Sequence, residues 1–461
     1  MERKTEDIVE QAVSRKLTRR TALGLAGATA LSASGLLAAC GSDGGTAEGT
    51  GASALGNKKA KAGQVWNLQL LTNDWNTVMT DAAERTATLL GIDDYNSAVF
   101  EGDETAAFKF AQDAVSAGAA MWFIQAADGS SLPAIARLAN SREIYMSNMW
   151  AEAPWYSVFD AGPYYVWFLT GAGLDLGDDM NFYETAKYTL QEYVDTRGDT
   201  GTVHHIAGII GGSIDSQRTR AVKRAIAEFP GLKLVGGLEG RWGPEGGNKA
   251  AKELVSRYGK PDVLISQNDG ILDGALAAYD SLGIVPGEDV LCGSSDGENT
   301  IIQQIQAGRV VSTAWTSPAY FGAACVVHCF DALNGVEYTA PERQMGIWGL
   351  PITKENVDGF IKRYVDNKNL PFDPKLMSRY LSGDKFDPMA HLQPINMAAF
   401  WAGAGVDKPS GYEYPEAYLK AGGSTDPTDT TYKGEMKEID DLYQANYKIK
   451  MDDFAYEGVA V

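Results

Sequence analysis

The sequence predicts an α/β protein built on parallel β-sheet. Short apolar runs of strand length alternate with stretches whose apolar residues follow helical spacing, which indicates βαβ units. The clearest case is the segment 260–311, where strands are expected at Val263–Ser266 and Val290–Gly293. Helices are expected at Ile271–Leu282 and Ile301–Ala307, and a glycine directly follows each of them.

Polar residues stand just past both of these expected strands. Asn268 and Asp269 follow the first strand, and Asp296 follows the second. Open parallel sheets bind ligands outside the carboxyl ends of their strands, so these side chains are candidates for ligand contact. A lone aspartate at a helix N-terminus is more often a plain cap. The repetition at two strand ends is what favours a binding role.

Length and composition describe a globular protein of two or three domains. The chain has 461 residues, of which 44% are hydrophobic and 22% charged, enough to form full cores. Its formal net charge of −20 argues against a nucleic-acid partner, because a phosphate-binding surface needs concentrated lysine and arginine.

Neither a disulfide framework nor a bound cofactor is expected. If Cys40 is used in processing, three cysteines remain, which cannot all pair. Cys325 and Cys329 lie four residues apart with His328 between them, so a metal site has to be considered, but buried apolar cysteines are the better interpretation. The glycines at 211–212 match neither a dinucleotide fingerprint nor a phosphate loop.

Residues 1–39 have the features of a bacterial export signal. Arg19 and Arg20 precede an apolar stretch of small residues and resemble a twin-arginine signal. Ala22 stands where an aromatic is usual, so the twin-arginine and general export routes both stay open. The residues Leu-Ala-Ala-Cys at 37–40 resemble a lipobox, which implies cleavage before Cys40 and its acylation. Residues 40–63 form a flexible linker by composition.

The segment described first resembles the ribose- and galactose-type periplasmic sugar-binding proteins, the type 1 periplasmic binding proteins. The resemblance rests on QND-x₃-DGAL-x-AYDSLG at 267–283, then SSDG at 294–297 and IQAGRVVST at 305–313. It implies two doubly wound parallel-sheet lobes joined by a hinge, with Asn268, Asp269 and Asp296 accepting hydrogen bonds from sugar hydroxyls in the cleft. It covers roughly residues 65–335, with an inserted tract after Trp150.

The resemblance adds candidate ligand contacts from other segments. Asn73, Asp74 and Trp75 follow the first expected strand, where the family has a polar residue and an aromatic that stacks on the sugar. A core tryptophan is the alternative for Trp75. Arg218 stands where the family's arginine reaches the ligand, with Arg220 as the alternative if the register differs by two residues. A solvated helix arginine is the other reading of either residue.

Two further candidates depart from the family pattern. Asn148 stands where the family usually has an aspartate, and Thr316 where it usually has a glutamine. Both remain candidate ligand contacts. The departures leave the identity of the sugar open.

The expected organisation places lobe 1 in residues 64–160 and 312–350, lobe 2 in residues 161–311, and a C-terminal extension in residues 351–461. No catalytic residues are expected, since the four histidines form no H-E-x-x-H. The implied function is that of a monomeric, lipid-anchored binding protein of an ABC importer, outside the cell membrane or in the periplasm. It would carry a monosaccharide or polyol to the membrane permease, without cofactor or metal. The alternatives are a sensor for a receptor kinase and an exported carbohydrate-active enzyme.

Overall fold

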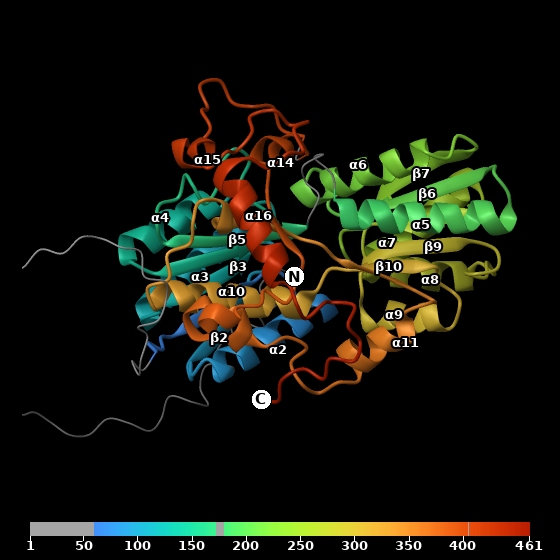
Figure 1. Ribbon diagram of the computed structural model, residues 1–461. Helices are drawn as coiled ribbons and strands as arrows, with labels where there is room; N and C mark the ends of the chain where they lie inside the picture. Colours follow the sequence, from blue (N-terminus) through green and yellow to red (C-terminus); the bar gives the residue numbers. More distant parts are fainter. Residues whose placement is uncertain (1–59, 172–178, 404) are drawn as a thin grey trace, which may run out of the picture. The chain divides into compact units, whose positions relative to one another are not determined.

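A computed structural model describes residues 60–171, 179–403 and 405–461 of the chain (Figure 1). The expected export signal, Cys40 and most of the linker therefore lie outside the described residues. Within those ranges no helix combines the length and apolar character that a membrane span requires.

The first lobe is built on a seven-stranded sheet, counted over the described residues. Its order is β13-β11-β5-β4-β3-β1-β2, and neighbours are parallel except that β13 runs antiparallel to β11. The strands are β1 (Val65–Gln69), β2 (Tyr95–Val99), β3 (Met121–Gln125), β4 (Tyr145–Met149), β5 (Tyr165–Gly171), β11 (Gln344–Ile347) and β13 (Leu392–Pro394).

Helices cover both faces of this sheet, as a doubly wound fold requires. One face packs against α2 (Asp74–Leu89) and α10 (Pro318–Leu333), which also pack on each other. The other face packs against α3 (Glu104–Ala117) and α4 (Leu132–Arg142). The central strands β3 and β4 are almost wholly buried. Burial on both faces is why β3 reads as an almost continuous apolar run rather than an alternating one.

The second lobe is built on a six-stranded sheet with the order β12-β10-β9-β8-β6-β7, again over the described residues. Its strands are β6 (Gly201–Ala207), β7 (Leu232–Glu239), β8 (Val263–Ser266), β9 (Leu291–Asp296), β10 (Ser312–Trp315) and β12 (Leu350–Thr353). Two helices, α5 (Met180–Arg197) and α6 (Ser213–Ala227), pack on one face, and α7 (Pro244–Tyr258), α8 (Asp269–Ser281) and α9 (Asn299–Gln306) pack on the other.

The points at which the chain changes lobe differ from the expected boundaries at 161 and 312. β5 pairs with β4 and belongs to the first sheet, whereas it was expected in lobe 2. β10 pairs with β9 and belongs to the second sheet, whereas it was expected in lobe 1. The expectation was wrong at both strands because an apolar run shows that a strand is buried but not which sheet it joins.

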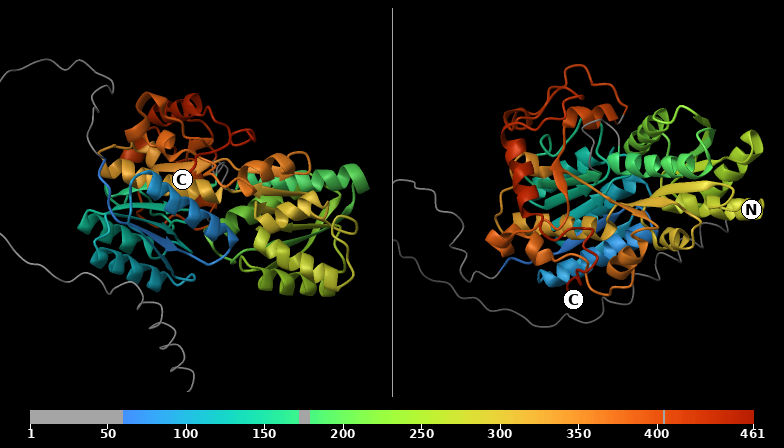
Figure 2. Two further views of the ribbon diagram at one scale, coloured as in Figure 1. Left: turned by 90° about the horizontal axis from the view of Figure 1, so that it is seen from below. Right: turned by 45° about the vertical axis from the view of Figure 1, so that its right-hand side comes forward.

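The C-terminal extension adds an edge strand to each sheet. β12 pairs antiparallel with β10, and β13 pairs antiparallel with β11. The remaining elements are α11 (Val357–Phe360), a π-helical turn η3 (Ile361–Val365), α12 (Pro374–Met377), α13 (Arg379–Ser382), α14 (Met397–Gly403), α15 (Glu416–Lys420) and α16 (Gly434–Asn446). The orange to red ribbon in Figures 1 and 2 follows the extension from β12 back to the first sheet. The extension thus covers backbone groups that would otherwise be open sheet edges.

One buried arginine holds the beginning of the extension to its end. The Arg363 side chain on η3 is 1% exposed. Its Nη1 donates to the carbonyls of Lys450, Met451 and Asp453 at 2.5, 3.2 and 2.9 Å, and its Nη2 donates to the carbonyl of Pro371 at 3.2 Å. The guanidinium therefore satisfies several backbone acceptors that burial removes from water.

Arg363→Met is expected to lower the free energy of unfolding by about 3 kcal/mol, because it leaves these carbonyls without a donor. Chemical denaturation of the purified protein measures the loss. Lys362→Met is the matched control, since the neighbouring Lys362 is exposed and its replacement is expected to change stability by less than about 0.5 kcal/mol. Equal effects of the two substitutions would contradict this role of Arg363.

Candidate ligand site

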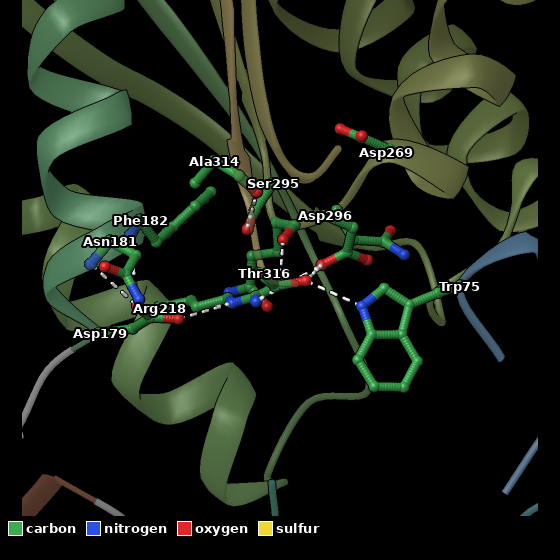
Figure 3. A network of polar contacts seen from close by, with 12 residues as sticks. Trp75, Asp179, Asn181, Phe182, Arg218, Asp269, Ser295, Asp296, Ala314 and Thr316 are labelled. Carbon is green, nitrogen blue, oxygen red and sulfur yellow. Dashed lines mark hydrogen bonds and ion pairs between the residues drawn. The ribbon is translucent and has the colours of Figure 1, made fainter. Parts of the chain in front are cut away.

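A chain of polar contacts connects residues of the two lobes at the carboxyl ends of their strands (Figure 3). The Trp75 indole Nε1–H donates to Thr316 Oγ1 at 2.8 Å, and the Thr316 hydroxyl lies 3.4 Å from Asp296 Oδ1. Arg218 Nη2 lies 3.6 Å from the same Asp296 oxygen. The structure therefore brings together four of the residues that the sequence singled out, in the order Trp75, Thr316, Asp296 and Arg218.

Arg218 is the buried centre of this network. Its side chain is 3% exposed, its Nε donates to Asp179 Oδ2 at 3.0 Å, and its Nη1 donates to the Gln267 carbonyl at 2.5 Å. The guanidinium also lies over the rings of Trp150 (5.6 Å), Phe182 (5.6 Å) and Trp242 (5.8 Å). A buried guanidinium requires such partners, because the loss of water is costly for a charge.

The two candidate arginines of α6 have different surroundings. Arg220, the alternative to Arg218, donates from Nη1 to the Ala402 carbonyl of the extension at 2.7 Å. Arg218 instead lies 3.6 Å from Asp296 through its Nη2. The structure thus places Arg218 in the network and Arg220 on the contact with the extension.

Trp75 is held in place by the first turn of α2. Asn73 caps this helix, since its Oδ1 accepts from the Asn76 backbone N–H at 2.9 Å. The Trp75 ring is 4% exposed and meets the rings of Trp150 and Phe321 edge to face. It is thus a packed wall residue whose polar edge points at Thr316.

Asp296 ends β9 in an unusual backbone conformation. Its φ is 130°, a region that side chains other than glycine rarely adopt, and such residues often occur at functional sites. Its side chain is 12% exposed. Burial raises the pKa of Asp296 to about 6, although the Arg218 charge and the Asn268 amide act in the opposite direction. Asn268 itself caps α8 by accepting from the Ile271 N–H at 3.0 Å.

Asp269 lies apart from the network (Figure 3). Its hydrogen bonds are to other residues of the second lobe. It is fully buried and accepts hydrogen bonds from the Ser294 hydroxyl, from the Glu298 backbone N–H at 2.7 Å and from Thr313 Oγ1 at 2.8 Å. Burial, together with the nearby Asp296 charge, raises the pKa of Asp269 to about 8. Its carboxylate ties the start of α8 to the β9–α9 turn and to β10.

Asn148 is also placed away from the network. It is fully buried on β4, in register with Ile124 and Phe168, which belong to the core on the α3 and α4 face. Its Nδ2 donates to the Ala151 carbonyl at 2.8 Å. Residues in register on parallel strands share a face, so Asn148 points into the interior of the first lobe.

Residues that the sequence reasoning did not select complete the site. Asp179 caps α5 by accepting from the Asn181 and Phe182 N–H groups while it binds Arg218. Asn181 donates to the Ile347 carbonyl at 3.1 Å and accepts from the Gly349 N–H at 2.8 Å, which fixes the crossing between β11 and β12. Both lie in the inserted tract, where no family motif was available. An aspartate before a helix was the one local signal.

A hollow adjoins the network on the side of Trp75. Its lining combines aromatic, aliphatic and acidic side chains from both lobes and the extension: Asp74, Trp75, Val78, Asp296, Gly297, Glu298, Asn299, Trp315, Pro318, Ala319, Phe360, Tyr364, Val365 and Pro371. Burial raises the pKa of Glu298 to about 9, and the carboxylates of Asp269, Asp296 and Asp74 add to the effect. The hollow is therefore lined by aromatic rings, by the acceptor oxygens of Asp74 and Asp296, and by a Glu298 carboxyl group that keeps its proton at neutral pH.

Metal binding has no support within the described ranges. No group of three or more histidine, cysteine or acidic side chains there is arranged to hold a metal ion. Cys292, Cys325 and Cys329 are buried free thiols, and burial raises the pKa of Cys292 and of Cys329 to about 12.

Residues 66–337, more than half of the chain, match the protein family described as "Periplasmic binding protein domain". The chain belongs to this family. Its fold agrees with that of a structure described as a twin-arginine translocation pathway signal protein from Burkholderia phytofirmans. The TM-score is 0.58 at 20% identity, over 66% of this chain and 93% of that one. The expected family and fold class, two mostly parallel sheets flanked by helices, are thus confirmed.

Two curated relatives match more limited parts of this binding protein. The galactofuranose-binding protein YtfQ of Escherichia coli (strain K12) is 26% identical over 154 residues, which cover 32% of this chain and 47% of that protein. The xylitol-binding protein of Mycolicibacterium smegmatis is 26% identical over 191 residues, which cover 36% and 54%. The chain spans about half the length of the curated relatives it matches.

Glu298→Gln is expected to stabilise the protein increasingly as the pH rises from 5 to 8. The folded Glu298 keeps its proton up to about pH 9, whereas an unfolded glutamate loses it near 4.5. The wild type therefore loses stability across this window, and glutamine does not. Chemical denaturation at pH 5, 6, 7 and 8 measures the difference. The exposed Glu288→Gln serves as control, and a difference that does not vary with pH would contradict the interpretation.

Proposed function

We propose that this protein is an extracytoplasmic solute-binding protein of an ABC importer, and that its ligand is a monosaccharide or polyol. The observation that carries the proposal is the Arg218–Asp296–Thr316–Trp75 network, in which a charged donor, a carboxylate acceptor, a hydroxyl and an aromatic ring meet. These are the groups that bind hydroxyls and ring C–H faces. The names of the two relatives, for galactofuranose and xylitol, support the same ligand class.

The contact lengths indicate where a ligand would bind. Arg218 is oriented by short bonds to Asp179 and Gln267, whereas its distance to Asp296 is 3.6 Å and that from Thr316 to Asp296 is 3.4 Å. Hydrogen bonds of this kind are normally about 2.7–3.0 Å long. A ligand hydroxyl placed between these groups would accept from Arg218 and donate to Asp296 in better geometry. The preoriented guanidinium would lose little conformational freedom on binding.

Ligand capture would then be a hinge motion. Trp75 comes from the first lobe, Asp296 and Arg218 come from the second, and Thr316 lies at the crossing between β10 and α10. A ligand that contacts both lobes stabilises the closed arrangement by its differential affinity for it. The closed form is the one that a membrane permease would recognise, with release of the ligand to the transporter.

A thermal-shift screen of residues 64–461 against pentoses, hexoses, polyols, nucleosides and amino acids tests this function. A ligand at one hundred times its dissociation constant is expected to add about 2.7 kcal/mol to stability. Asp296→Asn and Arg218→Lys are expected to weaken binding of the hit about tenfold or more, since each removes a directional partner of a ligand hydroxyl. Calorimetry measures the dissociation constants.

Asp289→Asn is the matched control, because Asp289 pairs with Lys260 at 2.7 Å on the surface of the second lobe. It is expected to leave the affinity unchanged. No response to any sugar or polyol would contradict the proposed ligand class. A ligand recovered as a cleaved product would favour an enzyme instead.

We further propose that the protein is anchored by lipid at Cys40, which lies outside the described residues. The support is the Leu-Ala-Ala-Cys sequence at the end of the apolar segment. Mass spectrometry of the protein purified from membranes is expected to show a chain that begins at an acylated Cys40. Cys40→Ser is expected to move the protein out of the membrane fraction. An unmodified Cys40 in the mature chain would contradict the anchor.

A further inference from the structure

The C-terminal extension brings aromatic side chains to the hollow beside the ligand network. After β12 the chain turns through Asn356, whose Oδ1 accepts from the Thr353 N–H at 2.9 Å, and enters α11 and η3. Phe360 and Tyr364 follow four residues apart, a spacing that places both on the same side of a helix. Both line the hollow.

These rings pack on Trp315, the last residue of β10. The Trp315 ring centroid lies 5.4 Å from that of Phe360 and 4.0 Å from that of Tyr364. Trp315 directly precedes Thr316, and it also lines the hollow. The aromatic wall formed by Trp315, Phe360 and Tyr364 is therefore continuous with the proposed ligand network.

Hydrogen bonds to other segments hold the aromatic wall in place. Arg363, which lies between Phe360 and Tyr364 in the sequence, donates to the carbonyls of Lys450 and Asp453. The Tyr364 hydroxyl donates to the Met451 carbonyl at 2.6 Å. On the other side, Gln306 of α9 donates to Asp358 Oδ1 at 2.9 Å. Rings held in this way cannot move aside at low cost, so they restrict what enters the hollow.

The hollow and the network share two residues. Trp75 and Asp296 belong to the network and also line the hollow. A ligand held at Asp296 would therefore direct one of its groups toward Phe360 and Tyr364. The remaining polar lining includes the Asp74 side chain and the protonated carboxyl group of Glu298, and there is no lysine or arginine among the residues that line the hollow. This lining suits hydroxyl groups and offers no cation to an anionic one.

We propose that Phe360 and Tyr364 are specificity-determining residues of the ligand site, which limit the size of the ligand group that fits beside Asp296. This inference rests on the proposed function. It assigns the C-terminal extension a part in ligand selection, in addition to covering the sheet edges. The ligand class is then a neutral sugar or polyol with a compact group at the position that faces the extension.

Calorimetric titration of Phe360→Leu and Tyr364→Leu tests the inference. The ligand is the hit of the screen, compared with its singly O-methylated derivatives. The wild type is expected to bind the parent and to reject at least one derivative. Both variants are expected to bind the parent about tenfold more weakly, through loss of aromatic contact, and to gain affinity for that derivative relative to the parent.

Phe454→Leu is the matched control. Phe454 also belongs to the extension and packs against Gly359, next to Phe360, but it does not line the hollow. It is expected to lower the melting temperature to a similar extent and to leave the ratio of affinities unchanged. The ratio of affinities for the parent and the derivative therefore distinguishes a change in ligand selectivity from a general loss of stability.

The outcomes distinguish the two proposals. If the wild type binds a sugar or polyol and the two variants keep its affinity ratio, the role of the extension is refuted and the proposed function stands. If the wild type binds no sugar or polyol, the proposed function fails and the inference fails with it. If Phe360→Leu, Tyr364→Leu and the control Phe454→Leu all shift the ratio of affinities to the same extent, the effect does not come from the rings that line the hollow, and the inference is refuted.

Discussion

The burial of one positive charge constrains most of the site. Arg218 is 3% exposed, and its charge is balanced by Asp179 and Asp296 rather than by water. Its partners are the N-cap of α5, the residue that follows β8 and the last residue of β9. Removing a charge from water is costly unless partners surround it, so the positions of these elements depend on one another through a single guanidinium.

Two aspartates with similar sequence settings have different roles. Asp269 stands shortly after β8 and Asp296 is the last residue of β9, yet Asp269 is surrounded by donors from neighbouring strands and turns. The contacts of Asp296 to Thr316 and Arg218 are long, at 3.4 and 3.6 Å. An acceptor whose partners are complete is structural, whereas one whose partners are incomplete is open to a ligand. The unusual backbone of Asp296 is consistent with this difference.

The extension is integrated into both lobes instead of forming a separate domain. It completes the edge of each sheet and supplies rings that pack on Trp315. A sheet edge needs a cover, and a packed ring needs a fixed support. The C-terminal extension provides both the edge strands and the support for the rings, and the hydrogen bonds of Arg363 hold its beginning to its end.

The fold class, the family and the strand ends at which polar residues gather could be predicted from the amino-acid sequence, because these features depend on local periodicity and short motifs. The sequence did not determine which sheet β5 and β10 join, that Asn148 faces inward, or that Asp179 is the partner of Arg218. Those features depend on contacts between distant positions, such as Trp75 and Thr316, which are 241 residues apart. A local pattern indicates whether a residue is buried, whereas the partner that it packs against depends on how distant parts of the chain come together.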